Sequence, residues 1–231
     1  MVKIKKVKSY KVILFDLDGT LTDPKVGITK SVQYALKHFR IQEASLDNLV
    51  HFIGPPLKES FINNYGFDAN KADAALQKYR EYFAETGIYE NKIFPGIPEL
   101  LEKLVAQGKT LAVATAKPTV FAEKILKHFG IYNFFSVISG VSLENSMIPK
   151  ETIIRTALTR LGIDGKKITS SEVIMIGDRK HDVVGANKAG IDSIAVLYGY
   201  GSLGELKKEN PTYVVESVSR LEKLLLDKSI V

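Results

Sequence analysis

The sequence contains no cysteine among its 231 residues, which excludes disulfides, thiolate nucleophiles and zinc sites built on cysteine. It also lacks any apolar run of transmembrane length. The basic N-terminus is followed only by the short run 12–15 before Asp16, too short for the apolar core of an export signal. Repeats and low-complexity segments are absent as well. We therefore expect a protein of the reducing cytoplasm with no membrane partner.

The formal net charge of +6 comes mainly from five lysines near the N-terminus, namely Lys3, Lys5, Lys6, Lys8 and Lys11. A solvated lysine arm, or an affinity for anionic surfaces, explains this charge as well as nucleic-acid binding does. No nucleic-acid recognition motif accompanies it, so we expect no specific nucleic-acid partner.

Short, continuous apolar runs predict strands that are covered on both faces, as in a parallel sheet. They lie at 12–15, 111–115, 137–140, 173–177 and 193–197. Between them, helical patterns end at glycines, over 97–107, 119–129 and 150–161. This alternation predicts an α/β fold with a Rossmann-like, doubly wound parallel sheet.

The stretch between the first and second predicted strands breaks the alternation, because it has helical segments and no convincing buried strand. Turn residues mark its two ends, at 22–24 and 94–98. We expect a catalytic core formed by residues 1–21 and 95–231 and an inserted helical cap over 22–94. An insert placed directly after the first strand sits over the carboxyl ends of the strands, where open α/β sheets bind ligands.

Two carboxylates, Asp16 and Asp18, follow the first predicted strand. In extended chain they point to the same side, because Leu17 takes the other side. Two bare carboxylates ~4 Å apart repel by about 4 kcal/mol at an effective dielectric constant of ~20, so the pair needs a cation, a shared proton or open water.

Other predicted strand ends and helix starts add polar residues to the same edge of the sheet. Thr115 follows an apolar run beside a helix start, which suits a phosphate, although an ordinary strand-end residue fits the pattern equally. Lys150 begins a helix, where a cation is unfavourable for the helix dipole unless an anion is near. Asp178 and Asp182 either cap a helix or complete a set of hard oxygen ligands suited to Mg²⁺.

The chain resembles the haloacid dehalogenase-like hydrolase superfamily, whose four motifs it matches in order. The matching residues are DLDGT at 16–20, Thr115, Lys150 and GDRKHD at 177–182. The similarity covers nearly the whole chain, since the helical insert resembles that family's cap. Within the superfamily, the chain is similar to the phosphoglycolate phosphatase-like branch. Three segments carry this similarity: GPPL at 54–57, TAKP at 115–118 and YGYGS at 198–202.

The resemblance implies a phosphoaspartyl mechanism with Asp16 as nucleophile and Asp18 as acid and base. It implies Mg²⁺ held by Asp16, the backbone carbonyl of Asp18 and Asp178, with Asp182 in a supporting role. We hypothesise that the pKa of Asp18 lies above that of Asp16. The phosphate-binding residues implied are Asp16, Gly19, Thr20, Thr115, Ala116, Lys117 and Lys150.

The function expected is a Mg²⁺-dependent phosphatase for a small phosphorylated metabolite, either phosphoglycolate or a nucleoside monophosphate. A sugar phosphomutase stays open, although the cap loop FIGPPLKES offers Lys58 and no arginine for a second phosphate. A non-catalytic binding or regulatory protein also stays open. Gly54, Pro55 and Lys58 are the candidates for specificity in the cap. Phe52 and Arg80 are among further cap candidates to which the sequence assigns no role, and the oligomeric state, monomer or dimer, is left open.

Overall fold

The computed structural model describes residues 8–145, 147–163 and 169–226. Within these ranges, six parallel strands form the central sheet in the order β5-β4-β1-β6-β7-β8. The strands are β1 (Val12–Phe15), β4 (Thr110–Pro118), β5 (Val137–Val141), β6 (Val173–Gly177), β7 (Asp192–Val196) and β8 (Tyr213–Val215). After β1 the chain builds the sheet outward on one side with β4 and β5 and then on the other with β6 to β8. This is the doubly wound arrangement expected from the sequence.

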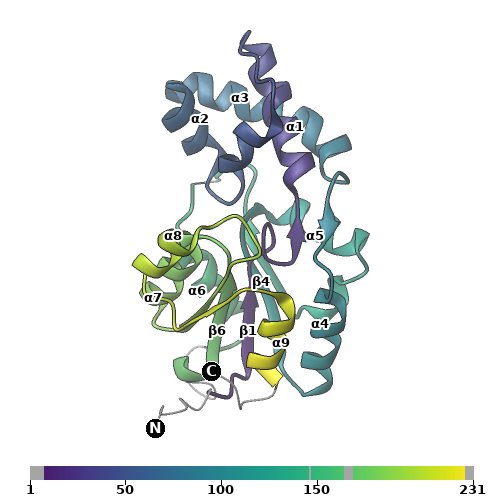
Figure 1. Cartoon of the computed structure of the whole chain (residues 1–231), viewed down its shortest axis with the longest axis vertical. Helices are drawn as coiled ribbons and strands as arrows, with labels where there is room; N and C mark the ends of the chain where they lie inside the picture. The colour runs from purple at the N-terminus through teal and green to yellow at the C-terminus, as the bar shows by residue number, and fades with distance from the viewer. Residues whose placement is uncertain (1–7, 146, 164–168, 227–231) are drawn as a thin grey trace.

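Helices cover both faces of the sheet (Figure 1). One face carries α4 (Ile97–Ala106), α5 (Thr119–His128) and α9 (Val218–Leu226), and the other carries α6 (Lys150–Arg160), α7 (Lys180–Ala189) and α8 (Leu203–Lys208). The side chains of β1 alternate between the two cores: Ile13 and Phe15 belong to one, Val12 and Leu14 to the other. All four are buried, which is why the strand reads as an unbroken apolar run.

All five strands expected from the sequence are present, but two details differ. The second predicted strand does not end at Thr115, because β4 continues to Pro118 with an irregular register after Ala114. β8 was not expected, since its three residues are too short to produce a recognisable apolar run. The three predicted helices over this part of the chain end within two residues of their expected ends.

The helical segment between β2 and β3 is called the cap below, and it stands at one end of the sheet (Figure 1). Its elements are α1 (Lys25–His38), the 3₁₀ helix η1 (Leu46–Phe52), α2 (Leu57–Tyr65), α3 (Ala69–Tyr82) and the π-helical turn η2 (Phe83–Gly87). The two-residue strands β2 (Thr22–Asp23) and β3 (Lys92–Ile93) pair antiparallel where the chain enters and leaves it. Because β1 leads directly into this segment, the cap stands over the carboxyl ends of the parallel strands.

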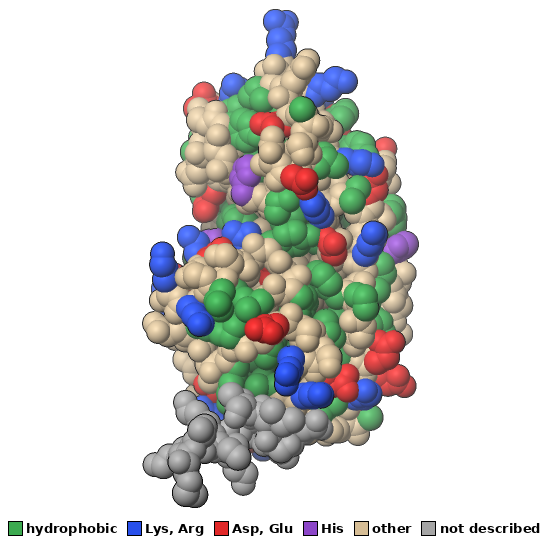
Figure 2. Space-filling view, viewed as in Figure 1, with side chains coloured by type: hydrophobic (Ala, Val, Ile, Leu, Met, Phe, Trp, Pro, Cys, Tyr) green, Lys and Arg blue, Asp and Glu red, His purple; other side chains and the backbone are tan. Residues whose placement is uncertain are grey.

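The basic N-terminal segment is partly paired with acidic groups of the core. Lys8 Nζ lies 2.7 Å from Asp192 Oδ2, and Lys11 Nζ lies 2.5 Å from Glu172 Oε1. Lys3, Lys5 and Lys6 lie outside the described residues. On the face in Figure 2, basic and acidic side chains are interspersed. No helix in the described part of the chain is both long and apolar enough to cross a membrane.

Candidate active site

The ends of the central strands bring polar residues from distant parts of the chain together. Asp16 follows β1, Asp178 follows β6, and both side chains are buried. Carboxylate oxygens of Asp16, Asp178 and Asp182 lie within 4.8 Å of one another. Thr115, in β4, is also buried and borders the same cavity as Asp16. Parallel topology explains this convergence, because the carboxyl ends of parallel strands meet at one edge of the sheet.

Lys150 lies between two of these carboxylates. Its Nζ is 2.8 Å from Asp16 Oδ1 and 2.6 Å from Asp182 Oδ1, and all three side chains are almost fully buried. Burial alone would lower the pKa of Lys150, but the two carboxylates override it and raise that pKa, so the ammonium stays charged. Asp182 also accepts a hydrogen bond from Arg179 N at its other oxygen, over 3.0 Å. Asp182 therefore caps α7, one of the two roles left open from the sequence, and also contacts Lys150.

Asp178 is enclosed by backbone and small residues. Its Oδ2 accepts a hydrogen bond from Tyr200 N over 2.7 Å, and its Oδ1 accepts one from Thr20 Oγ1 over 3.3 Å. Gly19 has a φ of 86°, and a Cβ placed there would lie 2.3 Å from Asp178 Oδ2. Gly199 packs similarly, at 2.4 Å from Asp178 Cβ. Gly19 and Thr20, assigned to phosphate binding from the sequence, lie against Asp178 in the structure.

Asp18 is paired with Lys117. Lys117 Nζ lies 2.7 Å from Asp18 Oδ2 and 4.5 Å from the centroid of the Phe83 ring in the cap. Asp18 Oδ1 is buried and has no hydrogen-bond partner among the described residues. Burial raises the pKa of Asp18, and the opposing effect of the Lys117 ammonium does not cancel this rise. The pairing with Asp18 differs from the prediction for Lys117, which was phosphate binding.

The charges of this cluster are unbalanced. Four buried carboxylates face two ammonium groups, those of Lys117 and Lys150; the carboxylates are Asp16, Asp18, Asp178 and Asp182. Burial, followed by the carboxylates of Asp182 and Asp16, raises the pKa of Asp178 well above its usual range. Isolated buried carboxylates are costly unless a cation or a proton compensates them. Because the donors are hard oxygens, the residues present fit a divalent cation such as Mg²⁺.

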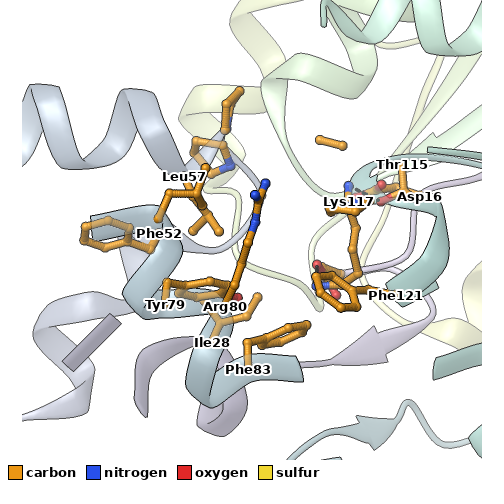
Figure 3. Close-up of a pocket in the computed structure, with 17 residues that line it drawn as sticks. Asp16, Ile28, Phe52, Leu57, Tyr79, Arg80, Phe83, Thr115, Lys117 and Phe121 are labelled. Atoms are coloured by element: carbon orange, nitrogen blue, oxygen red, sulfur yellow. Dashed lines mark hydrogen bonds and ion pairs between the residues drawn. The ribbon is translucent and has the colours of Figure 1, made fainter. Parts of the chain in front are cut away.

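Asp16 and Asp18 border a cavity between the core and the cap, called the aromatic cavity below (Figure 3). Its wall is mainly apolar, with ring side chains from both the cap and the core. The lining includes Ile28, Phe52, Leu57, Leu76, Tyr79, Arg80, Phe83, Thr115, Ala116, Lys117 and Phe121.

A second cavity also reaches Asp16 and contains more charged groups. It is lined by Lys150, Arg179, His181 and Asp182, and by Gly54 of the cap. Asp16 is thus accessible from two sides, one mainly apolar and one with polar and charged groups.

The three specificity candidates chosen in the cap from the sequence have different positions. Gly54 and Pro55 line the aromatic cavity. Lys58 does not line either cavity that contains Asp16; its ammonium lies 2.7 Å from Asp73 Oδ1 in the neighbouring helix α3.

Two arginines connect the core and the cap, and sequence reasoning gave neither a role. Arg179 Nη1, in the core, donates to the carbonyl oxygen of Ile53 in the cap over 2.9 Å. Arg80 Nη2, in the cap, donates to the carbonyl oxygen of Leu143 in the core over 2.7 Å. A signal for Arg80 was present in the sequence: Leu76, Tyr79 and Phe83 recur at helical spacing. Arg80 lies on the same apolar stripe, where a charged side chain is unusual.

The family model of the haloacid dehalogenase-like hydrolases matches residues 13–196, and the chain belongs to this family. A 5′-nucleotidase of Pseudomonas aeruginosa is 48% identical over 216 residues, which cover 94% of this chain and 96% of that protein. A phosphoglycolate phosphatase of Vibrio parahaemolyticus is 30% identical over 91% of this chain and 94% of its own length. The crystal structure of a predicted phosphatase from Clostridium acetobutylicum has 48% identity and a TM-score of 0.90, covering 95% of this chain and all of that chain.

Proposed function

We propose that this hydrolase is a Mg²⁺-dependent phosphatase that removes the phosphate of nucleoside 5′-monophosphates through a phosphoaspartyl intermediate on Asp16. The choice of substrate is based on the aromatic cavity. This cavity adjoins Asp16 and Asp18, and its ring and aliphatic side chains can contact the leaving group. A nucleoside is a leaving group with a planar, weakly polar base that can stack on such rings. Phosphoglycolate has no apolar part to bury there. The similarity to a 5′-nucleotidase supports the same choice.

In the proposed reaction, a carboxylate oxygen of Asp16 attacks the phosphorus in line, and the bond from phosphorus to the ester oxygen breaks. Asp18 gives its proton to the departing ester oxygen, which leaves as the 5′-hydroxyl of the nucleoside. Asp18 then takes a proton from a water molecule that attacks the phosphorus of the acyl phosphate. Inorganic phosphate leaves, and the Asp16 carboxylate and the Asp18 carboxylic acid are both restored.

The other residues of the site hold charge during these steps. Lys150 and Thr115 are proposed to contact the transferring phosphoryl oxygens, whose negative charge spreads in the transition state. Asp16, Asp178 and the backbone carbonyl of Asp18 would hold Mg²⁺, which would supply positive charge where an anionic nucleophile approaches an anionic phosphate. Burial of Asp18 raises its pKa, which favours the protonated form that its first role requires.

The test is release of inorganic phosphate from a panel of nucleoside 5′-monophosphates and phosphoglycolate, with Mg²⁺ and with EDTA. We expect the wild type to be active with Mg²⁺ and to prefer the nucleotides. Asp16→Asn is expected to lose at least about 10³-fold in kcat, because an amide is a poor nucleophile. Asp47→Asn, a change at an exposed aspartate of the cap, is the matched control.

Three outcomes contradict the proposal. If Asp16→Asn is as active as the wild type, Asp16 is not the nucleophile. Absence of phosphate release from every substrate supports the non-catalytic alternative. A higher kcat/KM for phosphoglycolate than for any nucleotide rejects the proposed substrate class.

A sugar phosphomutase is the second candidate, and Arg80 is the observation that favours it. The cap loop lacks an arginine, as the sequence shows, but α3 places the Arg80 side chain at the wall of the aromatic cavity. An arginine can hold a second phosphate. Incubation with hexose 1-phosphates and a trace of hexose bisphosphate separates the two functions, since a mutase forms hexose 6-phosphate and a phosphatase forms inorganic phosphate.

A further inference from the structure

Arg80 occupies an unusual place for a charged side chain. It lies on α3 beside Tyr79 and one turn from Leu76 and Phe83, and all four residues line the aromatic cavity. Figure 3 shows its guanidinium group between Leu57 of the cap and the core residue Lys117. A mainly apolar binding site uses its few convergent polar groups to orient its ligand.

The guanidinium group of Arg80 has N–H donors that are available to a ligand. Nη2 donates to the carbonyl oxygen of Leu143 over 2.7 Å, which fixes the position of the side chain. In the described part of the chain, no other hydrogen bond and no ion pair involves this guanidinium group. An arginine carries five N–H donors in a planar fork, so several remain for a ligand.

The two lysines of the site differ from Arg80 in this respect. Lys117 is paired with Asp18, and Lys150 is paired with Asp16 and Asp182. Both therefore belong to the charge cluster where the phosphoryl group is proposed to bind. Arg80 forms no ion pair with a carboxylate among the described residues, although the charges of Glu144 and Asp73 act on it from nearby. It stands on the opposite, cap side of the aromatic cavity.

We infer that Arg80 is a specificity-determining residue that donates hydrogen bonds to a carbonyl oxygen of the nucleobase, and so selects 6-oxopurine and oxopyrimidine nucleotides over adenine nucleotides. This inference rests on the proposed function. The O6 and N7 acceptors of a 6-oxopurine match the arginine fork, whereas adenine presents an amino donor in place of O6. A base with a carbonyl would thus stack on the surrounding rings and bind Arg80 at its edge.

A second phosphate or a carboxylate could also bind an arginine, but the surroundings favour a base. The neighbouring groups are the rings of Phe52, Tyr79, Phe83 and Phe121, which suit a planar heterocycle and offer few donors to a dianion. Phosphoglycolate, which carries a carboxylate, and a hexose bisphosphate, which carries a second phosphate, test these two alternatives.

The experiment compares kcat/KM for inosine 5′-monophosphate, adenosine 5′-monophosphate and phenyl phosphate in the wild type, Arg80→Met and Arg80→Lys. Phosphoglycolate and a hexose bisphosphate are measured in parallel with the same three proteins. We expect the wild type to prefer the inosine nucleotide. In Arg80→Met, kcat/KM for that substrate is expected to fall by about 10- to 100-fold, the usual effect of losing a hydrogen bond from a charged donor. The values for adenosine 5′-monophosphate and phenyl phosphate should change by less than about threefold, and Arg80→Lys should restore part of the preference. Lys78→Met, a change two residues away at a more exposed lysine paired with Glu81, is the matched control.

The outcomes separate this inference from the proposed function. One result is that Arg80→Met lowers kcat/KM equally for the two nucleotides and phenyl phosphate while its thermal stability is unchanged. That result means that Arg80 only binds Leu143, and it overturns the inference. So does a selective loss for phosphoglycolate or for a hexose bisphosphate, which would assign Arg80 to a carboxylate or a second phosphate. If the wild type hydrolyses nucleotides without distinguishing the two bases, the inference fails and the proposed function stands. If it hydrolyses no nucleotide, the proposed function fails first.

Discussion

Arg179 of the core donates a hydrogen bond from Nη1 to the carbonyl oxygen of Ile53 in the cap, over 2.9 Å. Its Nε lies 3.2 Å from Glu205 Oε1, which holds the side chain from the core side. Gly54 packs so closely on it that a Cβ there would lie 2.6 Å from Arg179 Cγ. Since Arg179 directly follows Asp178, one residue connects the candidate metal site to the cap loop at the wall of both cavities.

We predict that Arg179→Met raises KM for the preferred nucleotide by about 10-fold, with a smaller change in kcat. The variant keeps the aliphatic contact with Gly54 but loses the hydrogen bonds to Ile53 and Glu205, so the cap loop is held less firmly. Hydrogen exchange at residues 53–57 should increase, as measured by mass spectrometry.

Arg155→Met is the control for this change, because Arg155 is an exposed arginine of α6 whose polar contacts among the described residues are with Glu151 and Lys188 of the core. It should alter neither KM nor exchange at residues 53–57. Unchanged exchange in Arg179→Met would show that the cap loop keeps its position without the arginine.

A second prediction concerns the glycine of the first motif. Gly19 has a positive φ and leaves no room for a side chain beside Asp178. Gly19→Ala is expected to displace the Asp178 carboxylate and to weaken Mg²⁺ binding by at least about 10-fold, the range seen when groups that orient ligands are altered. Isothermal titration of Mg²⁺ into the wild type and the variant measures this.

Gly108→Ala is the matched control for backbone strain, since Gly108 also has a positive φ, of 73°, and no atom lies near its missing Cβ. It should lower thermal stability and leave Mg²⁺ affinity unchanged. Equal Mg²⁺ affinity in wild type and Gly19→Ala would mean that Asp178 tolerates the added methyl group.

The sequence predicted the core of the fold because its strands are buried on both faces. β1 and β6 contain only apolar residues and a terminal glycine, and the helices between strands end at glycines, so both patterns are strong and local. β8 could not be found in this way, because it has three residues and depends on pairing with β7. The predicted end of β4, at Thr115, differs from the observed end at Pro118. The last residues of β4 pair irregularly with β5, and no local sequence pattern encodes such a register.

For the candidate site, the motifs predicted the residues of the charge cluster but not their partners. The contact between Lys117 and Asp18 joins residues 99 positions apart and depends on the orientation of two side chains. Arg80 reaches the aromatic cavity only because the cap folds over the core. Spacing along the chain predicts which strand ends meet, whereas contacts between the cap and the core depend on how the two parts pack.

A third prediction concerns Glu172, which lies far from the candidate site. Its pairing with Lys11, together with a hydrogen bond from Thr169 N, lowers the pKa of Glu172 from 4.5 to about 2. The folded protein therefore keeps this carboxylate ionised at a pH where the unfolded chain binds a proton. Its contribution to stability is complete above about pH 4.5 and is lost as the pH falls toward about 2.

Glu172→Gln should accordingly have a slightly lower Tm than the wild type at neutral pH, and the difference should narrow as the pH is lowered below about 4.5. Thermal melts across this pH range measure it, with Glu102→Gln, a change at an exposed glutamate of α4, as the control. A difference in Tm that does not depend on pH would mean that ionisation of Glu172 contributes nothing.

The last prediction concerns Lys150, whose ammonium lies within 2.8 Å of Asp16 and 2.6 Å of Asp182. Lys150→Met removes the positive charge and leaves two buried carboxylates without it, a change that typically costs about 3–5 kcal/mol in the free energy of unfolding. For a chain of this length, that corresponds to a fall in Tm of about 6–20 °C. Chemical denaturation and thermal melts without Mg²⁺ measure both quantities, with Lys127→Met, a change at an exposed lysine of α5, as the control.

Adding Mg²⁺ should raise the Tm of Lys150→Met more than that of the wild type, because the added cation then compensates carboxylates that Lys150 no longer pairs with. The variant should nevertheless remain inactive, since Mg²⁺ cannot replace the proposed contact of Lys150 with the phosphoryl oxygens. A Tm that falls in Lys150→Met but responds to Mg²⁺ no more than the wild type would place the metal away from Asp16. The response to Mg²⁺ therefore tests the metal site without relying on catalytic activity.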